Sequence, residues 1–306
     1  MISCKTEPGV GKWERLTRTQ IEGRLNGCAC LPSLSSIDSA LRELLSADQR
    51  YTSQIAEIIR RDPSLTARLL RLVNSVYYGI STPIKNIEEA VFYLGVRQIR
   101  QLAMSTPIIE DFQKLTSNVR FPWREFWRHC IGTALMTREV IDLVQSPNEE
   151  DDYLAGLIHD VGKIVMAAVF PEHFYEIYHR RSETEVDLCA LEQDVLGLDH
   201  SELGALYLKK QLLPEIFTEI VRYHHHPDQA PQHGYITAAV QVADLLVHHA
   251  NIGNSGNHRE VTYESWMDSA GGKILFAHQT EAERSLMRAS LQRSLDRIPT
   301  LLEGLV

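Results

Sequence analysis

The residues best suited to chemistry are histidines and aspartates in the second half of the chain. His159 and Asp160 are neighbours within the segment 157–163, LIHDVGK. A helix that carries the two side by side offers a neutral imidazole and a carboxylate to one metal cation. A solvated pair on a surface helix is the alternative, because the dipeptide alone is frequent by chance. The pair gains weight only from the residues that accompany it.

Histidines before and after this pair favour the metal interpretation. His129 lies on the helix predicted before the pair, and His200 opens a later helix. His224 and His225 end another predicted helix, with His224 eight residues after Ile216 on its apolar face. His224 should therefore point inward, where a histidine needs a partner, and a metal is one option.

Asp244 is the remaining candidate, and its surroundings are unusual for a carboxylate. It lies in the run 236–247, ITAAVQVADLLV, which is apolar on nearly every side. An aspartate is almost never fully buried without a partner, and a salt bridge would supply one. The run contains no lysine or arginine, which favours a metal or a histidine as the partner.

The helix predicted to carry the His-Asp pair has two distinct sides. Its core stripe contains Leu154, Leu157, Ile158 and Val161. His159 and Asp160 are expected to point away from this stripe, on the side of three small residues, Ala155, Gly156 and Gly162. Small residues at these positions would let a neighbouring helix or a metal come close.

Helical periodicity runs along the chain without strand alternation of any length, so the predicted fold class is all-α. Asn86 and Glu89 resemble a capping box, and Gly95 is placed to end the same helix. Polar residues and Pro122 between positions 110 and 123 mark the boundary between two halves. The predicted helices are 37–45, 53–60, 63–76, 87–94, 123–144, 152–169, 171–181, 183–196, 201–211, 214–224, 236–250 and 281–302, with a loop at 251–257.

The composition of the chain limits the kinds of molecule that it is expected to bind. The chain has 306 residues and a formal net charge of −9, without a basic tract. Binding to a phosphate backbone or to an anionic membrane surface relies on clustered lysine and arginine, so neither direct nucleic-acid binding nor membrane binding is expected. The N-terminus lacks the apolar region of a secretory signal, and we expect a cytoplasmic location.

Cysteine usage agrees with a reducing compartment. The five cysteines are scattered, and no disulfide framework is expected. Cys28 and Cys30 are close enough to hold a metal, but no further ligand lies near them in the sequence. We predict that this pair plays no part in metal binding.

The ordered series of histidines and aspartates resembles the ligand series of the HD superfamily of metal-dependent phosphohydrolases. A set of sequence blocks in both halves is similar to the HDOD family, and together they cover roughly residues 25 to 250. These blocks are LPSL at 31–34, DPSLT at 62–66, LVNSVYYG at 72–79, IEEAVFYLG at 87–95, FWRH at 126–129, GLIHDVGK at 156–163 and YHHHP at 223–227.

The resemblance implies an N-terminal helical HDOD subdomain over 25–115 and an HD-like metal-binding helical domain with a C-terminal extension over 120–306. It also implies a role in bacterial signal transduction with a protein partner. Carried over position by position, the implied ligands are His129, His159, Asp160, His200, His224, His225 and Asp244.

Seven ligands suit one or two divalent or trivalent metal ions. With two ions, Asp160 would bridge, one ion taking His129, His159 and Asp244 and the other taking His200, His224 and His225. Imidazole and carboxylate ligands suit iron, manganese or zinc, and iron is favoured by analogy with binuclear HD enzymes.

Two functions fit this site. HDOD members are commonly regarded as non-enzymatic, which favours a regulatory module; the alternative is a metal-dependent phosphohydrolase acting on a nucleotide or another phosphate ligand. In an enzyme, Lys163 could neutralise phosphate oxygens. The glycine-rich signature of cyclic-dinucleotide phosphodiesterases is matched only by Gly234 and Tyr235, so we expect little turnover of such substrates.

The remaining histidines and aromatic residues have structural interpretations. His226, His248 and His249 are expected to be exposed rather than ligands. The aromatic residues Tyr77, Tyr78 and Trp127 are expected to pack between the two halves.

Overall fold

The structure is a computed structural model. It describes residues 13–28, 83–95, 119–144, 152–183, 186–257 and 265–302, with shorter pieces at 56–57, 59–60, 66, 69–70, 74, 99, 112, 115 and 261–262. Every regular element in these residues is a helix, which confirms the all-α prediction. The helices are α1 (Arg18–Gly27), α5 (Ile87–Leu94), α7 (Trp123–Leu143), α8 (Asp152–Ile158), α9 (Val161–Val169), α10 (Pro171–Arg181), α11 (Leu188–Val195), α12 (His200–Lys210), α13 (Glu215–Tyr223), the 3₁₀ helix η2 (Pro227–Gln229), α14 (Gly234–His249), α15 (Ser265–Asp268), α16 (Ala270–Phe276) and α17 (Glu281–Leu302).

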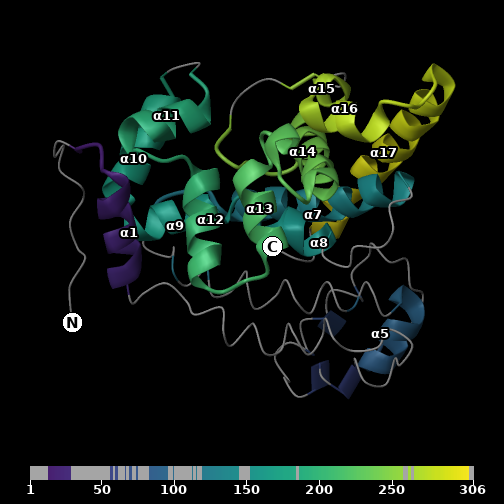
Figure 1. Ribbon diagram of the computed structural model, residues 1–306. Helices are drawn as coiled ribbons and strands as arrows, with labels where there is room; N and C mark the ends of the chain where they lie inside the picture. The colour runs from purple at the N-terminus through teal and green to yellow at the C-terminus, as the bar shows by residue number, and fades with distance from the viewer. Residues whose placement is uncertain are drawn as a thin grey trace.

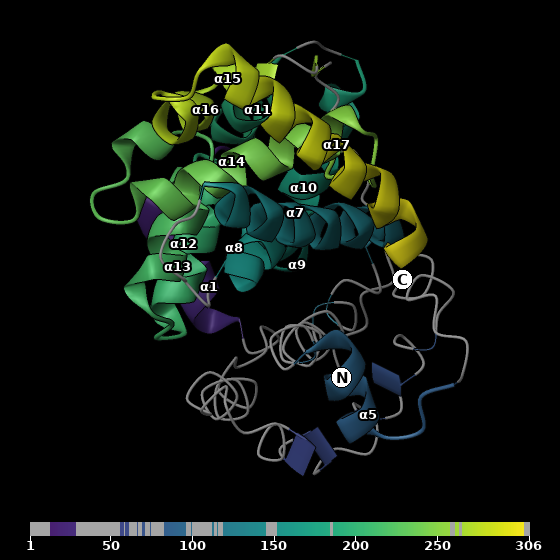
Figure 2. The ribbon, with the colours of Figure 1, turned by 90° about the vertical axis from the view of Figure 1, so that its right-hand side faces the viewer.

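Helix α7 lies at the centre of the second half. It packs against α8, α14 and α17, while α12 packs against α9 and α13 on the other side of the His-Asp segment (Figure 1). Helix α5 lies apart from these helices in both views (Figure 2). The short helices α15 and α16, which pack on α14, are absent from the predicted elements.

No single helix among the described residues is long and apolar enough to cross a membrane; segments 152–169 and 171–181 pass that test only as a pair bent by 116°.

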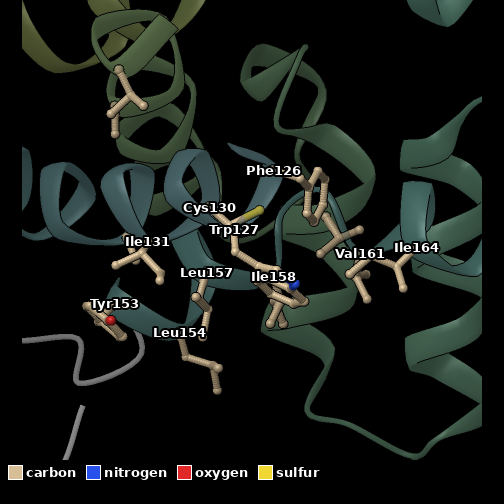
Figure 3. Packing of buried hydrophobic residues seen from close by; sticks show 14 of the residues in the cluster. Phe126, Trp127, Cys130, Ile131, Tyr153, Leu154, Leu157, Ile158, Val161 and Ile164 are labelled. Carbon is tan, nitrogen blue, oxygen red and sulfur yellow. The ribbon is translucent and has the colours of Figure 1, made fainter. Parts of the chain in front are cut away.

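The core next to the site forms where α7 meets α8 and α9. The predicted stripe of Leu154, Leu157, Ile158 and Val161 is buried, but so is every other residue of α8, so this helix is enclosed on all sides rather than on one face. Figure 3 shows these side chains together with their neighbours from α7, which are Phe126, Trp127, Cys130 and Ile131. This packing holds the backbone of the His-Asp segment against the helix that carries His129.

The single helix predicted over 152–169 breaks at the His-Asp pair. Residues 159 and 160 form a turn between α8 and α9, and Asp160 has φ −97° and ψ 14°. Successive residues of an uninterrupted helix point about 100° apart. The turn instead lets His159 and Asp160 face one cluster, and each is only 1% exposed. The prediction of one continuous helix is therefore wrong at the residues that matter most.

Small residues bring neighbouring helices close to the pair, as predicted. A Cβ at Gly156 would lie 2.6 Å from Ala134 Cα of α7. A Cβ at Gly162 would overlap the carbonyl oxygen of His200 at the start of α12. Both contacts are too close for any side chain, so these glycines set the approach of α7 and of α12 to the His-Asp segment.

The segment before α1 and α1 itself pack on the second half of the chain. The Leu16 amide donates to Leu196 O at 3.0 Å, and His173 Nε2 lies 2.9 Å from Glu14 O. The guanidinium of Arg180 stacks on Trp13 at 4.3 Å from the ring centroid. Residues 13–16, which the predicted domain ranges leave unassigned, thus pack on helices of the second half of the chain.

Several local predictions can be compared directly. The Asn86 side chain accepts from the Glu89 amide at 2.8 Å, and Gly95 ends α5 with φ +81°, so both caps are confirmed. The predicted helix at 183–196 begins only at Leu188, because Asp187 caps it. The ring centroids of Trp127 and Phe112 are 6.4 Å apart, and Phe112 belongs to the predicted N-terminal range 25–115, as expected of packing between the halves. Tyr77 and Tyr78 lie outside the described residues, as do most of the predicted helices between positions 37 and 76.

Cys28 is disulfide-bonded, which was not anticipated from scattered cysteines for which no disulfide framework was expected. Its sulfur is therefore not a free thiolate, which agrees with the prediction that Cys28 takes no part in metal binding. Cys30 lies outside the described residues.

Candidate metal centre

Three of the predicted ligands form the first side of a buried cluster, defined by His129, His159 and Asp244. Their ligand atoms all lie within 4.8 Å of one another. His129 Nε2 is 3.0 Å from Asp244 Oδ1, and His159 Nε2 is 3.8 Å from the same oxygen. Both histidines are buried, whereas the Asp244 side chain remains 16% exposed. The partner predicted for Asp244 is therefore a histidine, at an opening rather than in a closed core.

The second side of the cluster is defined by His200, His225 and a residue that the sequence analysis missed, Cys189. Their ligand atoms also lie within 4.8 Å of one another. His200 Nε2 and His225 Nε2 are 3.0 Å apart. His200 is buried, and His225 and Cys189 are half-buried.

Asp160 joins the two sides through its two carboxylate oxygens. Oδ2 lies 3.5 Å from His159 Nε2 and 4.0 Å from His129 Nε2. Oδ1 lies 3.2 Å from His200 Nε2 and 3.8 Å from His224 Nε2. One carboxylate thus faces both groups of imidazoles, which is the position expected of a bridging ligand.

His224 occupies a different place from the one expected. It is fully buried, as predicted, but its ligand atom groups with those of His159 and Asp160. The sequence interpretation put it with His200 and His225. The structure therefore brings all seven predicted residues into one cluster but moves His224 to the middle, between the two sides.

Three histidines of the cluster are oriented by an oxygen atom that accepts a hydrogen bond from their Nδ1 atom. His159 donates to Gly156 O at 2.7 Å and His224 to Val221 O at 2.8 Å. A neutral imidazole that donates through Nδ1 carries its lone pair on Nε2, and the Nε2 atoms of both rings face the cluster. Hydrogen bonds of this kind commonly orient metal-binding histidines.

The third acceptor is Glu192, a fully buried carboxylate on α11. Its Oε2 lies 2.6 Å from His200 Nδ1 and accepts from the His200 backbone amide at 2.8 Å. Sequence reasoning missed Glu192, although a signal was present. It shares the spacing of Leu188, Leu191 and Val195, so it lies on the apolar face of its helix, where a carboxylate needs a partner.

Unpaired atoms at the centre test whether the residues fit a metal. His159 Nε2, Asp160 Oδ1 and His224 Nε2 are buried and have no hydrogen-bond partner within the described part of the chain. Leaving a buried polar atom unsatisfied costs about 1–3 kcal/mol. Two imidazole lone pairs and a carboxylate oxygen that converge on one region are the donor set of a transition-metal cation. The residues present therefore fit such an ion.

Lys163 is bound to the same carboxylate. Its ammonium donates to Asp160 Oδ2 at 2.7 Å, and the lysine is only 2% exposed. Burial by itself would raise the pKa of Asp160, but the charges of Lys163 and His159 hold it well below its usual range. Asp160 is thus a carboxylate whose negative charge is kept available inside the protein.

The histidines differ in how readily they take a proton. Burial lowers the pKa of His224 to about 3. Burial would also lower the pKa of His200, but the charge of Glu192 outweighs it and raises that pKa well above its usual value. His224 is therefore a neutral imidazole over the physiological range, whereas His200 would have to release a proton before it could bind a metal.

Polar contacts hold the loop that follows His225. Glu219 accepts from the backbone amides of Gln232 and His233 at 2.7 and 2.6 Å. Gln241 of α14 donates to the His225 carbonyl at 2.6 Å and accepts from the Gly271 amide at 2.7 Å. The backbone beside the second side is thereby tied both to α13 and to the C-terminal helices.

The other histidines are only partly as expected. His226 is exposed, as predicted. His248 and His249 are half-buried rather than exposed, and His249 Nδ1 lies 2.8 Å from Val261 O. Val261 therefore lies beside the last residue of α14, a contact that the sequence pattern did not indicate.

Comparison with known sequences identifies a family. The HDOD domain family matches residues 31–227. An uncharacterized protein of Treponema pallidum is 25% identical over 205 residues. That match covers 66% of this chain but only 39% of the longer relative.

Solved structures of other proteins resemble the fold of this chain. An HDOD domain protein of unknown function from Geobacter sulfurreducens superposes with a TM-score of 0.80 at 23% identity, covering 94% of this chain and 97% of that one. A provisionally assigned phosphohydrolase from Shewanella amazonensis gives a TM-score of 0.71 at 19% identity, covering 94% and 98%. A provisionally assigned signal transduction protein from Marinobacter aquaeolei gives 0.67 at 19% identity, covering 95% and 62%.

Proposed function

Since this chain belongs to the HDOD family, we propose that it is a regulatory module of bacterial signal transduction with a retained HD-type metal site. Its partner would be another protein, contacted in the cytoplasm through the helical N-terminal half. The likeness to a provisionally assigned signal transduction protein is consistent with this role, although at that identity it concerns the fold alone.

The metal site would hold two ions that share Asp160. The first side supplies His129, His159 and Asp244 to one ion, and the second side supplies His200 and His225 to the other. His224, between the two sides, is within reach of either. The imidazole and carboxylate donors favour iron, with manganese or zinc as alternatives. When bound, such ions would supply Lewis acidity and charge that fixes the relative positions of the helices.

The buried pair of Lys163 and Asp160 is the observation that carries the regulatory proposal. Hydrolysis of a phosphate ester needs groups that hold the phosphate as well as ligands that hold a metal. The ammonium of Lys163 instead donates to Asp160 and is 2% exposed, so it is not presented to an incoming phosphate. A buried charge pair of this kind stabilises one arrangement of ligands, which suits a structural or sensory metal.

A metal-dependent phosphohydrolase is the second candidate. The bridging position of Asp160 between two ligand groups favours it, because two ions a few ångströms apart can clamp both oxygens of a phosphoryl transfer. The partial exposure of Asp244 and His225 leaves a side on which a substrate could approach. In that case Lys163 would act on phosphate only after leaving Asp160.

Metal content and turnover of the untagged full chain test the proposal. The protein is loaded with Fe²⁺ or Mn²⁺ under reducing conditions and offered cyclic dinucleotides, nucleotides and a generic phosphodiester. We expect one to two ions per chain and no metal-dependent turnover. His159→Ala is the matched variant, because it removes a ligand of the first side without touching Lys163.

The outcomes separate the two candidates. Turnover that needs metal and disappears in both His159→Ala and Lys163→Ala would establish the phosphohydrolase and overturn the regulatory proposal. Bound metal without turnover, together with a partner protein whose binding needs the N-terminal half, would support it. A chain that binds no metal under these conditions would refute the metal site in either role.

A further inference from the structure

Cys189 lies where the second side of the cluster is open. It is in the first turn of α11, three residues before Glu192, and residues spaced by three share a helix face. Glu192 contacts Nδ1 of His200. Helix α11 thus presents a carboxylate and a thiol to the same imidazole ring, with the carboxylate at Nδ1 and the thiol within 4.8 Å of a ring nitrogen.

The distances around Cys189 are those of a ligand group. Its sulfur and the ligand nitrogens of His200 and His225 all lie within 4.8 Å of one another. The Nε2 atoms of His200 and His225 are 3.0 Å apart. Metal–sulfur and metal–nitrogen bonds in zinc sites are about 2.3 and 2.0 Å long, so donors of one ion lie within about 4 Å of each other. Only small side-chain movements separate this group from coordination.

An independent observation points to an ion at the same place. Asp160 Oδ1 is buried, has no hydrogen-bond partner among the described residues, and lies 3.2 Å from His200 Nε2. His224, the residue expected to complete this side, groups instead with His159 and Asp160. With His224 set between the two sides, Cys189 is the third potential donor that groups directly with His200 and His225.

We propose that Cys189 is a ligand of the second ion, with His200, His225 and Asp160 Oδ1 as its other donors. This inference rests on the proposed function, because it assigns a further ligand to the same metal site. Four donors of these types complete a tetrahedral zinc-like site. The two ions would then differ in chemistry, with only nitrogen and oxygen donors on the first side and a thiolate on the second.

A thiolate ligand makes the second side selective. Soft sulfur donors favour zinc, cobalt and ferrous iron, whereas manganese and magnesium prefer oxygen. The second side should therefore bind zinc or cobalt in the presence of excess manganese, while the first side accepts manganese. A mixed pair, with manganese or iron on the first side and zinc on the second, follows from this difference.

Cobalt substitution of the metal-stripped full chain provides the test. Thiolate bound to Co²⁺ gives an intense near-ultraviolet charge-transfer band that imidazole and carboxylate ligands do not give. We expect two Co²⁺ per chain, with the band growing as the second ion binds. Cys189→Ser should abolish the band. It should also lower the affinity for the ion of the second side by on the order of 100-fold, since even outer-shell changes lower metal affinity 10–100-fold.

Cys130 supplies the matched control, because it is the other free cysteine among the described residues and is buried beside His129. Cys130→Ala should keep the band and both ions. Cys189→Asp should keep two ions without the band and should now accept Mn²⁺ on the second side. Far-ultraviolet circular dichroism of the metal-free variants verifies that each one folds, and the wild-type band decides the question if one does not.

Each result has a distinct meaning. Two bound Co²⁺ ions without a charge-transfer band in the wild type would overturn the role of Cys189 and leave the metal site standing. A band that survives in Cys189→Ser, or that is lost in Cys130→Ala, would also overturn it. No bound Co²⁺ in the wild type would refute the proposed metal site itself.

Discussion

The two sides of the cluster are built in different ways. The proposed ligands of the first side come from the interiors of α7 and α14 and from the turn between α8 and α9, and α7, α8 and α14 pack on one another. The proposed ligands of the second side come from helix ends, with Cys189 and His200 in the first turns of α11 and α12 and His225 just beyond α13. Helix interiors are fixed by core packing, whereas helix ends depend on caps and short connections.

Side-chain contacts make up for the weaker backbone constraint at the second side. Where the backbone is less constrained, the structure adds side-chain contacts: Glu192 holds His200, and Gln241 holds the His225 backbone. On the first side, His159 is oriented by the backbone carbonyl of Gly156 in α8, the helix that it follows. We therefore expect the first side to respond mainly to helix packing and the second to single polar substitutions.

Removing Asp160 should abolish both sides at once, because its two oxygens face both groups. Asp160→Ala should lose most of the metal, as measured by elemental analysis of dialysed protein. The same change strands the charge of Lys163 in the core, which costs about 3–5 kcal/mol. The double variant Asp160→Ala with Lys163→Met removes both charges and separates metal loss from unfolding. Full occupancy in the double variant would show that Asp160 does not bridge.

Acid should destabilise the metal-free protein through His224, which lies between the two sides. Its pKa is lowered to about 3 by burial, while in the unfolded chain it is near 6.5. Between these values the unfolded state binds the proton and the folded state does not, so the free energy of unfolding falls as pH decreases from about 6.5 to about 3. The full effect is up to about 5 kcal/mol.

Denaturant unfolding from pH 7 to pH 4 in the presence of a chelator measures this effect. His224→Gln removes the titrating group and should lose less stability over the same range. Equal losses in the two proteins would mean that His224 does not set the acid sensitivity.

Replacing Gly156 or Gly162 by alanine should affect the two sides of the cluster differently, because each glycine is packed against a different helix. A Cβ at Gly162 meets His200 O of the second side, and a Cβ at Gly156 meets α7 of the first. Each substitution to alanine should destabilise the fold by about 3 kcal/mol, and Gly162→Ala should weaken the second ion more than the first. Gly23→Ala in α1 is the control, since a Cβ there would meet no atom within 4 Å and a gain of up to about 1 kcal/mol is expected.

Thermal unfolding and metal titration of the three variants check these expectations. A Gly162→Ala protein as stable as Gly23→Ala would show that α12 can move away freely, and the proposed rigidity of the approach would be wrong.

Glu192 offers the smallest and most selective change. Glu192→Gln keeps an oxygen that can accept from His200 but removes the negative charge that raises the pKa and basicity of the ring. We expect about a 10-fold loss of affinity for the second ion and little change for the first. Isothermal titration with Zn²⁺ after the first side has been filled with Mn²⁺ measures it. Equal losses at both ions would remove the distinction between the two sides.

Local patterns in the sequence correctly predicted much of the fold. Leu154, Leu157, Ile158 and Val161 are buried as predicted, although the other sides of α8 are buried too, and Asn86 and Gly95 identified both ends of α5. These features depend on neighbours within a few residues, which a sequence displays directly. The break between α8 and α9 could not be predicted in this way, because it is imposed by the contacts of His159 and Asp160 with three other helices.

The sequence by itself determined that the chain is helical, that it belongs with HDOD proteins, and which seven side chains could bind metal. These conclusions follow from residue types and their order, which folding does not alter. Only the tertiary structure decided that Lys163 is held by Asp160, that His224 stands between the two sides, and that Glu192 and Cys189 join His200. Such pairings depend on the angles and distances at which helices cross, and distances between residues remote in the chain exist only once the core has packed.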